Sequence, residues 1–257
     1  NVSPLLIGFP IVAVGTSLPE LAVTINAVSS NNQDLVDLAV GGVLGSNVAN
    51  IMLVLGTAAM LGACDKPGVG IKKDALAVII ASIILLITVI IGEITQIIGI
   101  LMILALISYY FYSYNYSKKL GLDEELEETW MGDNLLLATM ITILGGVMIV
   151  LGAEFLIEGS VGIADSFGIS ESIVGLSVIA LGTSLPELAV TIIAALRGHK
   201  GVAIGNVLGS NVINILGILG VSSAYAGGII VSEEFAARDI WVVIVTSGLI
   251  ATMLLNE

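Results

Sequence analysis

The chain has 257 residues, of which 57% are hydrophobic and only 11% are charged, and its mean hydropathy is +1.09. This composition excludes an ordinary soluble domain and predicts an all-α polytopic membrane protein whose main partner is the lipid bilayer. The net charge is −13, and a run of acidic residues lies in one predicted loop, 118–133; neither a nucleic acid, a bound cofactor nor an obligatory protein partner is expected. The single cysteine, Cys64, excludes an internal disulfide.

Apolar stretches long enough to cross about 30 Å of hydrocarbon follow one another along the whole chain. They predict eight transmembrane helices, near residues 4–29, 36–62, 75–92, 95–116, 134–157, 172–197, 201–227 and 237–255. The third and fourth are hard to separate, because residues 75–107 are almost continuously apolar. A single helix there would be about 50 Å long at 1.5 Å per residue, so we expect a tight turn around residues 92–96.

One eleven-residue string, Gly-Thr-Ser-Leu-Pro-Glu-Leu-Ala-Val-Thr-Ile, occurs twice, at residues 15–25 and 182–192. We call these copies the proline-glutamate segments. They lie on the first and sixth predicted helices, so an odd number of crossings separates them and they face opposite sides of the membrane. The halves are therefore predicted to form an inverted repeat, an arrangement recurrent in secondary transporters.

Aligning the halves leaves two predicted helices, 95–116 and 134–157, without a counterpart. Each half is therefore expected to be a five-helix unit, with eight of ten spans in this chain, which we expect to be a truncated form. Residues 1–117 would be a first repeat lacking its first helix, 118–133 an acidic linker, and 134–257 a second repeat lacking its last helix.

Basic residues in the predicted loops fall mainly on one side of the membrane. Seven lie on the side where the first helix starts: Lys66, Lys72, Lys73, Lys118, Lys119, Arg197 and Lys200. Only Arg238 lies on the other side. The positive-inside rule makes the first side cytoplasmic and the linker 118–133 with it, in a multi-pass protein of the cell membrane.

Each proline-glutamate segment places a carboxylate, Glu20 or Glu187, inside a predicted span. A charged side chain there costs on the order of 2.5–3.5 kcal/mol even on lenient insertion scales, so two at equivalent positions indicate a shared function. Small and polar residues share the face of each glutamate at helical spacing: Ala13, Thr16, Ser17 and Thr24, then Ala180, Thr183, Ser184 and Thr191. Pro19 and Pro186 leave backbone carbonyls free, for which a dehydrated cation is a suitable partner.

A second repeated string, Val-Leu-Gly-Ser-Asn-Val at residues 43–48 and 207–212, adds further oxygens. We call these copies the Gly-Ser-Asn segments. Ser46 and Asn50 lie one helical turn apart, as do Ser210 and Asn214. The donors are all oxygens, which favours hard cations such as Ca²⁺, with about 6–8 oxygen ligands, over zinc or copper. Two carboxylates balance one Ca²⁺, and sodium could use the same oxygens.

The two pairs of segments resemble the α-repeats of the calcium/cation antiporter superfamily, above all its prokaryotic sodium/calcium exchanger branch. The resemblance covers residues 15–56 and 182–220. It implies ten helices in two inverted fives and exchange of sodium for calcium by alternating access. No enzymatic activity is expected. The large cytoplasmic calcium-sensing domains of animal exchangers are missing from this sequence, so calcium regulation of that type is not expected.

The resemblance also implies roles for individual residues. Glu20 and Glu187 would bind both calcium and sodium, and Asn50 and Asn214 would lie at the centre of the site. The flanking sodium sites would take carbonyls or hydroxyls from Ala13, Thr16, Ser17, Ser46, Ala180, Thr183, Ser184 and Ser210. Many relatives, including the potassium-dependent branch, carry Asp where this chain has Asn214, which argues against potassium co-transport.

Three other functions remain as alternatives. In proton-coupled relatives the first segment has the form Gly-Asn-x-x-Glu, so the segment present here favours sodium, although buried glutamates can also carry protons. A cation channel could use the same oxygens, but it has no need of an inverted repeat. A hydrolase built on Ser17 or Ser184 would need an activating base, and the only histidine, His199, falls in a predicted loop.

Overall fold

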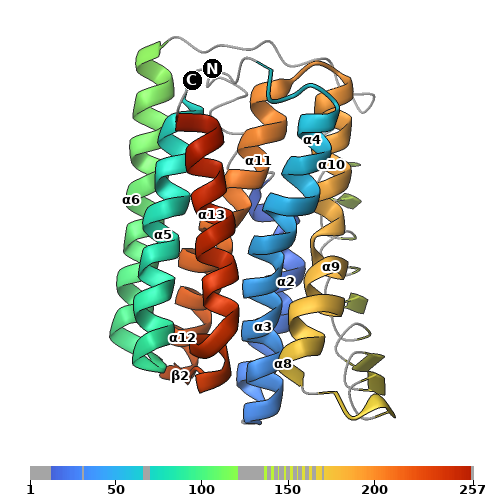
Figure 1. Cartoon of the computed structure of the whole chain (residues 1–257), viewed down its shortest axis with the longest axis vertical. Coiled ribbons are helices and arrows are strands. Elements are labelled where there is room, and N and C mark those ends of the chain that lie inside the picture. The colour runs from blue at the N-terminus through green and yellow to red at the C-terminus, as the bar shows by residue number, and fades with distance from the viewer. Residues whose placement is uncertain are drawn as a thin grey trace.

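The computed structural model describes residues 13–30, 32–65, 70–120 and 171–255, together with scattered residues between 136 and 169. In these ranges the long helices run side by side along one direction (Figure 1). The first half contains α2 (Leu18–Ser29), α3 (Gln33–Ala49), the π-helical η1 (Asn50–Leu55), α4 (Gly56–Met60), α5 (Ile71–Ile91), β1 (Glu93–Thr95) and α6 (Gln96–Leu120). The second half contains α8 (Glu171–Val174), η2 (Gly175–Ile179), α9 (Ala180–Thr183), α10 (Leu185–Leu196), α11 (Lys200–Val212), η3 (Ile213–Leu219), α12 (Gly220–Ala226), β2 (Gly228–Ile230), η4 (Phe235–Asp239) and α13 (Ile240–Leu255).

Within the described residues, five helices are long and apolar enough to cross a membrane. They are Gln33–Met60, Ile71–Ile91, Gln96–Tyr116, Lys200–Ala226 and Phe235–Leu254, and each coincides with a predicted span. A bent pair, Gly175–Thr183 and Leu185–Leu196 at 44°, lies where the sixth span is predicted. The first predicted helix is described only from residue 13, and the predicted helix 134–157 and most of the linker 118–133 lie outside the described residues.

The predicted break between the third and fourth helices is present. The helix α5 ends at Ile91, and Gly92 follows with a φ of 82°, a left-handed conformation that glycine adopts at low cost. The chain then forms β1, which pairs antiparallel with β2 in the register Glu93 to Ile230, Ile94 to Ile229 and Thr95 to Gly228. This two-stranded ribbon ties the α5–α6 turn to the α12–η4 turn.

Hydrogen bonds between loops mark the two ends of the described helical bundle. At one end, Lys200 Nζ donates to the carbonyl of Asp65 at 3.3 Å, so the loops before α5 and before α11 lie together. At the other end, Gln33 Nε2 donates to the carbonyl of Ile230 at 3.2 Å, beside the ribbon. We refer to these as the Lys200 end and the ribbon end.

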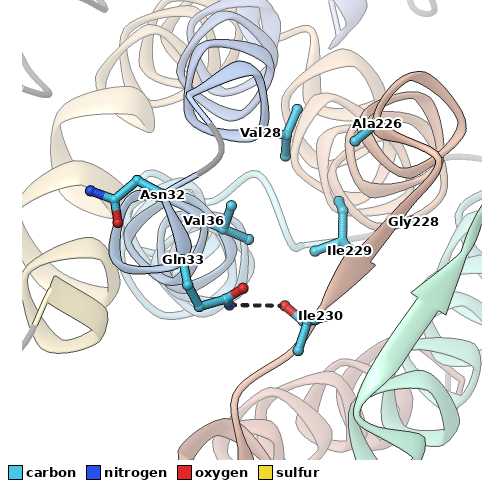
Figure 2. A pocket seen from close by; sticks show the side chains of 8 residues that line it. All are labelled: Val28, Asn32, Gln33, Val36, Ala226, Gly228, Ile229 and Ile230. Atoms are coloured by element: carbon cyan, nitrogen blue, oxygen red, sulfur yellow. Dashed lines mark hydrogen bonds between the residues drawn. The ribbon is translucent and has the colours of Figure 1, made fainter.

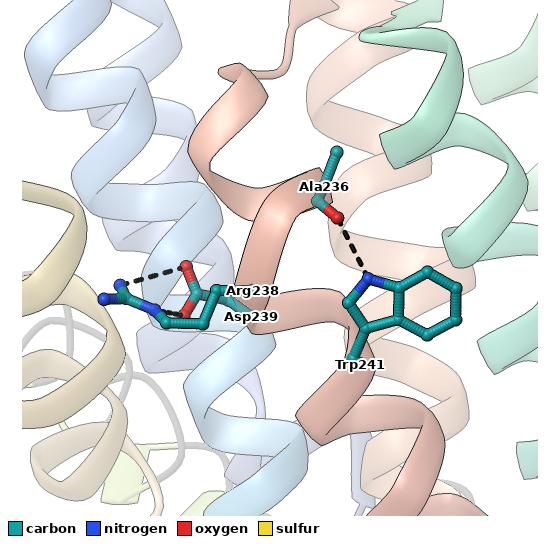
Figure 3. Close-up of polar contacts among 4 residues, drawn as sticks. All are labelled: Ala236, Arg238, Asp239 and Trp241. Carbon is teal, nitrogen blue, oxygen red and sulfur yellow. Dashed lines mark hydrogen bonds and ion pairs between the residues drawn. The ribbon is translucent and has the colours of Figure 1, made fainter.

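Arg238, the one basic residue predicted opposite the others, lies in η4 at the start of the span that runs from the ribbon end. Its Nε donates to Asp239 Oδ1 at 2.7 Å (Figure 3). Trp241, one turn along and 48% exposed, donates its indole N–H to the carbonyl of Ala236 at 3.1 Å. An aromatic ring that is partly exposed and has a satisfied N–H is typical of a membrane interface.

Glycines bring α3 into backbone contact with the helix of the second half. A Cβ on Gly45 would lie 2.4 Å from the carbonyl oxygen of Leu176, and one on Gly175 would lie 2.1 Å from that of Leu38. Only glycine permits such an approach, as in other closely packed membrane helices. This contact sets α3 directly against η2 and α9, which lead into the second proline-glutamate segment.

Candidate functional site

The two proline-glutamate segments break their helices at the same point. Residues 13–16 are helical, Ser17 forms a turn, and α2 starts again at Leu18; likewise α9 ends at Thr183, Ser184 forms a turn, and α10 starts at Leu185. The proline in the first turn of each new helix lacks the amide that would close the preceding turn. The glutamates thus follow directly after a helix break in both halves.

The two glutamates are buried to the same degree, with Glu20 2% and Glu187 0% exposed. Ser17 Oγ donates to Glu187 Oε1 at 3.4 Å, so the first segment reaches the carboxylate of the second. Both carboxylate oxygens of Glu20 and the Oε2 atom of Glu187 have no hydrogen-bond partner among the described residues. Two acidic side chains therefore meet in the interior with three oxygens that nothing described satisfies.

The first Gly-Ser-Asn segment also reaches the second half. Ser46 Oγ lies 3.0 Å from Thr183 Oγ1 and 3.4 Å from the carbonyl oxygen of Ala180, to which it donates. The equivalent serine, Ser210, has a buried hydroxyl with no partner within the described part of the chain, and so does Ser184. The hydroxyl of Thr16 donates within its own helix, to the carbonyl of Ala13 at 3.2 Å.

The two central asparagines lie where the helices loosen into π-helical turns. Asn50 begins η1 and Asn214 lies in η3, and such turns are frequently found at functional sites. Asn50 Nδ2 donates to Asn211 Oδ1 at 3.0 Å, and Asn211 Nδ2 donates to the carbonyl of Asn47 at 3.2 Å. Asn50 Oδ1 and both polar atoms of Asn214 find no partner among the residues described.

All twelve predicted site residues are buried. Direct hydrogen bonds link Ser17 to Glu187 and Ser46 to Thr183, each across the two halves.

Two residues of this region are absent from the predicted set: Asn211, which bridges the Gly-Ser-Asn segments, and Asn206, which donates to the carbonyl of Glu187. The sequence carries a signal for both: Asn211 belongs to the repeated string, and Asn206 lies one helical turn before Ser210 on the same face.

The concentration of unpaired buried oxygens indicates what this arrangement can do chemically. Most buried polar atoms in folded proteins have partners, so several unpaired ones in one place indicate an absent ligand. The donors here are carboxylate, hydroxyl, amide and carbonyl oxygens, which suit a hard cation. No group of three or more His, Cys, Asp or Glu side chains suited to a metal occurs in the described ranges, so a cation would depend on two carboxylates and neutral oxygens.

A cavity of about 240 Å³ lies at the ribbon end, between the last turn of α2, the first turn of α3 and β2 (Figure 2). Its lining residues are Val28, Asn32, Gln33, Val36, Ala226, Gly228, Ile229 and Ile230. Ala226 lies one helical turn beyond Ser222, a fully buried residue whose hydroxyl has no partner among the described residues.

The fold and the site define a helical membrane protein with a buried all-oxygen cluster between two copies of one segment. The family described as "Sodium/calcium exchanger protein" matches residues 1–115 and 137–256. The chain belongs to this sodium/calcium exchanger family, which is a family of transporters and not of enzymes.

Individual relatives agree with this assignment. The chain is 34% identical over 253 residues to the putative antiporter CaxA of Alkalimonas amylolytica, covering 94% of this chain and 76% of the relative. It is 30% identical to the sodium/calcium exchanger MaX1 of Methanosarcina acetivorans, covering 88% and 74%. The fold matches a solved structure of the sodium-calcium exchanger NCX_Mj with a TM-score of 0.66 and 28% identity, over 98% of this chain and 80% of that one.

Proposed function

We propose that this protein is a secondary antiporter that exchanges sodium for calcium at a buried site between Glu20 and Glu187. The observation that carries the proposal is the set of carboxylate oxygens on these two residues that have no partner among the described residues. A buried, unpaired carboxylate is costly, and a transported cation offsets that cost each time it binds. The relatives MaX1 and NCX_Mj are both named as sodium/calcium exchangers, which supports this choice of ions.

The oxygen ligands of the site account for competition between the two ions. Calcium takes the position between the carboxylates, because two negative charges balance one Ca²⁺. Sodium ions use the same carboxylates and add neutral oxygens from the flanking residues. Since both ions need Glu20 and Glu187, one cargo leaves before the other binds, which makes the protein an exchanger.

We assign the remaining predicted residues to the same site. Asn50 and Asn214 lie at its centre, and Ser46 and Ser210 complete the flanking sodium positions. The hydroxyls of Ser17 and Ser184 and the backbone carbonyls of Ala13, Thr16, Ala180 and Thr183 supply the other ligands. The carbonyls near each helix break are suitable, because the prolines withhold amides from that turn.

We further propose that transport proceeds by alternating access between two inverted five-helix repeats, 1–117 and 134–257, joined by a cytoplasmic linker at 118–133. The equivalent helix breaks at Ser17 and Ser184 support this layout, since broken helices at a repeat interface are typical of such transporters.

Reconstituted vesicles test this function directly. The protein is placed in lipid vesicles loaded with sodium, and uptake of radioactive calcium is measured after dilution into sodium-free buffer, with potassium-loaded vesicles as the control. We expect uptake that requires the outward sodium gradient. Uptake that follows a pH gradient and ignores sodium would assign the protein to proton-coupled exchange instead, and a turnover at channel rates would exclude an exchanger.

A further inference from the structure

Asn206 differs from the rest of the site, because the repeat does not supply a matching residue. It precedes the second Gly-Ser-Asn segment, and its counterpart before the first segment is Gly42. It lies on α11, one turn before Ser210 and on the same face, and it is 0% exposed. The other half has no room for such a side chain, because a Cβ on Gly42 would already lie 3.0 Å from Ile179 Cγ2.

The amide of Asn206 is oriented by two acceptors on α10. Its Nδ2 donates to the carbonyl of Glu187 at 3.4 Å and to Thr191 Oγ1 at 3.2 Å. A backbone carbonyl only accepts, so exchanging the amide nitrogen and oxygen would place two acceptors against each other. The Oδ1 atom therefore points away from these partners, and it has no hydrogen-bond partner within the described residues.

In the first half, the backbone carbonyl of Glu20, which is equivalent to that of Glu187, accepts its hydrogen bond from a different residue. There Thr24, the counterpart of Thr191, donates its own hydroxyl to the carbonyl of Glu20 at 2.7 Å. In the second half Asn206 makes the bond to the glutamate carbonyl and adds an oxygen that remains unpaired. A buried amide oxygen without a hydrogen-bond partner is destabilising, so this extra oxygen needs a ligand to offset its cost.

The position of Asn206 relates this oxygen to one side of the membrane. The helix α11 starts at Lys200, at the Lys200 end of the bundle. Asn206 lies about 9 Å along the helix axis from that start and Ser210 about 15 Å, at 1.5 Å per residue. Asn206 thus lies between the proposed site and the Lys200 end.

We propose that Asn206 Oδ1 is an additional ligand for a monovalent cation, one helical turn outside the site on the Lys200 side, and that it serves sodium rather than calcium. This inference rests on the proposed function. A neutral amide oxygen adds no charge, and calcium affinity depends strongly on the number of charged ligands. The extra oxygen therefore helps a sodium ion shed water before it reaches Glu187 and Ser210, and it does so from one side only.

The test compares Asn206→Ala with the wild-type protein in membrane vesicles of both orientations. With sodium presented at the Lys200 end, the sodium concentration for half-maximal calcium flux should rise about fivefold, which corresponds to about 1 kcal/mol. Sodium presented at the ribbon end should act as in the wild type, and calcium-for-calcium exchange should be unchanged. The proposal would be overturned if the sodium concentration for half-maximal flux rose equally from both sides, or did not rise from either.

Thr191→Ala distinguishes a role of Asn206 as a cation ligand from a role in holding α10 and α11 together. This variant removes one acceptor of the Asn206 amide, but the Glu187 carbonyl still accepts from Nδ2 and keeps Oδ1 directed away from α10, so we expect wild-type sodium dependence. If Thr191→Ala weakened the sodium dependence of flux as much as Asn206→Ala does, Asn206 would have a structural role, which would contradict the proposal.

Sodium binding to the purified protein gives a measurement that does not depend on exchange. The sodium concentration that raises the melting temperature half-maximally should be about fivefold higher for Asn206→Ala than for the wild type. If flux is absent but this difference is found, the proposed exchange fails and the sodium ligand stands. An unchanged sodium dependence would overturn the ligand whatever the flux.

Discussion

Glu20 and Glu187 are acidic side chains in a part of the molecule that contains few other charges. Their unpaired oxygens lie among hydroxyls and amides, of which several are also unpaired in the described part of the chain. Such a cluster destabilises the protein when it is empty and favours cation binding. The same oxygen atoms therefore account both for the affinity for cations and for the loss of stability when no cation is bound.

Replacing either glutamate tests this balance. Glu20→Gln or Glu187→Gln removes one negative charge beside the cation. At 4 Å and an effective dielectric constant of about 20, that charge is worth about 4 kcal/mol for Na⁺ and about 8 kcal/mol for Ca²⁺, so calcium affinity should fall by more than about a thousandfold. We expect calcium flux to be abolished in vesicles. We also expect a melting temperature in cation-free buffer that is not lower than that of the wild type, because a costly buried charge is gone.

The matched control is Glu93→Gln, on the exposed edge of β1 and far along the chain from both segments. Its calcium flux should equal that of the wild type. Wild-type flux in either Glu20→Gln or Glu187→Gln would exclude a shared site.

At the scale of elements, the close contact of α3 with η2 positions the serine of the first Gly-Ser-Asn segment. Gly45 lies against the Leu176 carbonyl, and the next residue, Ser46, bonds to Thr183 and Ala180. A wider spacing of these helices would break both bonds. Helix packing and the geometry of the site are therefore linked through one glycine.

Gly45→Ala should lower both stability and transport. Its Cβ would lie 2.4 Å from the Leu176 carbonyl oxygen and 2.6 Å from Ala180 Cβ, so the backbone must move. Overpacking of this kind costs about 1–3 kcal/mol, which a melting curve in detergent would detect. Gly248→Ala on α13 is the control, since no described atom lies within 4 Å of its added Cβ, and an unchanged Gly45→Ala protein would contradict the packing argument.

The sequence could predict the elements that depend on length and spacing, and it missed those that depend on contacts between distant segments. Hydrocarbon thickness required the break within residues 75–107, and helical spacing placed the twelve site residues on buried faces. The β1–β2 ribbon has only three residues per strand, too few for a visible alternation. The bond from Asn50 to Asn211 depends on how η1 and α11 lie against each other, which no local pattern specifies.

At the scale of the whole molecule, the loops gather at two opposite ends. The Lys200 end joins the loops before α5 and α11, and the ribbon end joins the α5–α6 and α12–η4 turns. An inverted repeat requires this alternation, and the basic residues predict that the Lys200 end is cytoplasmic.

Cysteine labelling tests the placement of the two ends. In a Cys64→Ser background, Asp65→Cys and Glu233→Cys each put one thiol on an exposed loop position, at the Lys200 end and the ribbon end respectively. A membrane-impermeant maleimide should label Asp65→Cys only from the cytoplasmic side and Glu233→Cys only from the opposite side. Labelling of both from one side would contradict the topology.

The central claim is that two glutamates from opposite halves bind one calcium ion in competition with sodium. Equilibrium binding of radioactive calcium to the purified protein tests it most directly, with sodium as competitor and Glu20→Gln and Glu187→Gln as controls. We predict a single calcium site per chain that sodium displaces competitively and that either variant loses. Calcium binding that persists at wild-type affinity in a variant, or that sodium leaves unchanged, would contradict the claim.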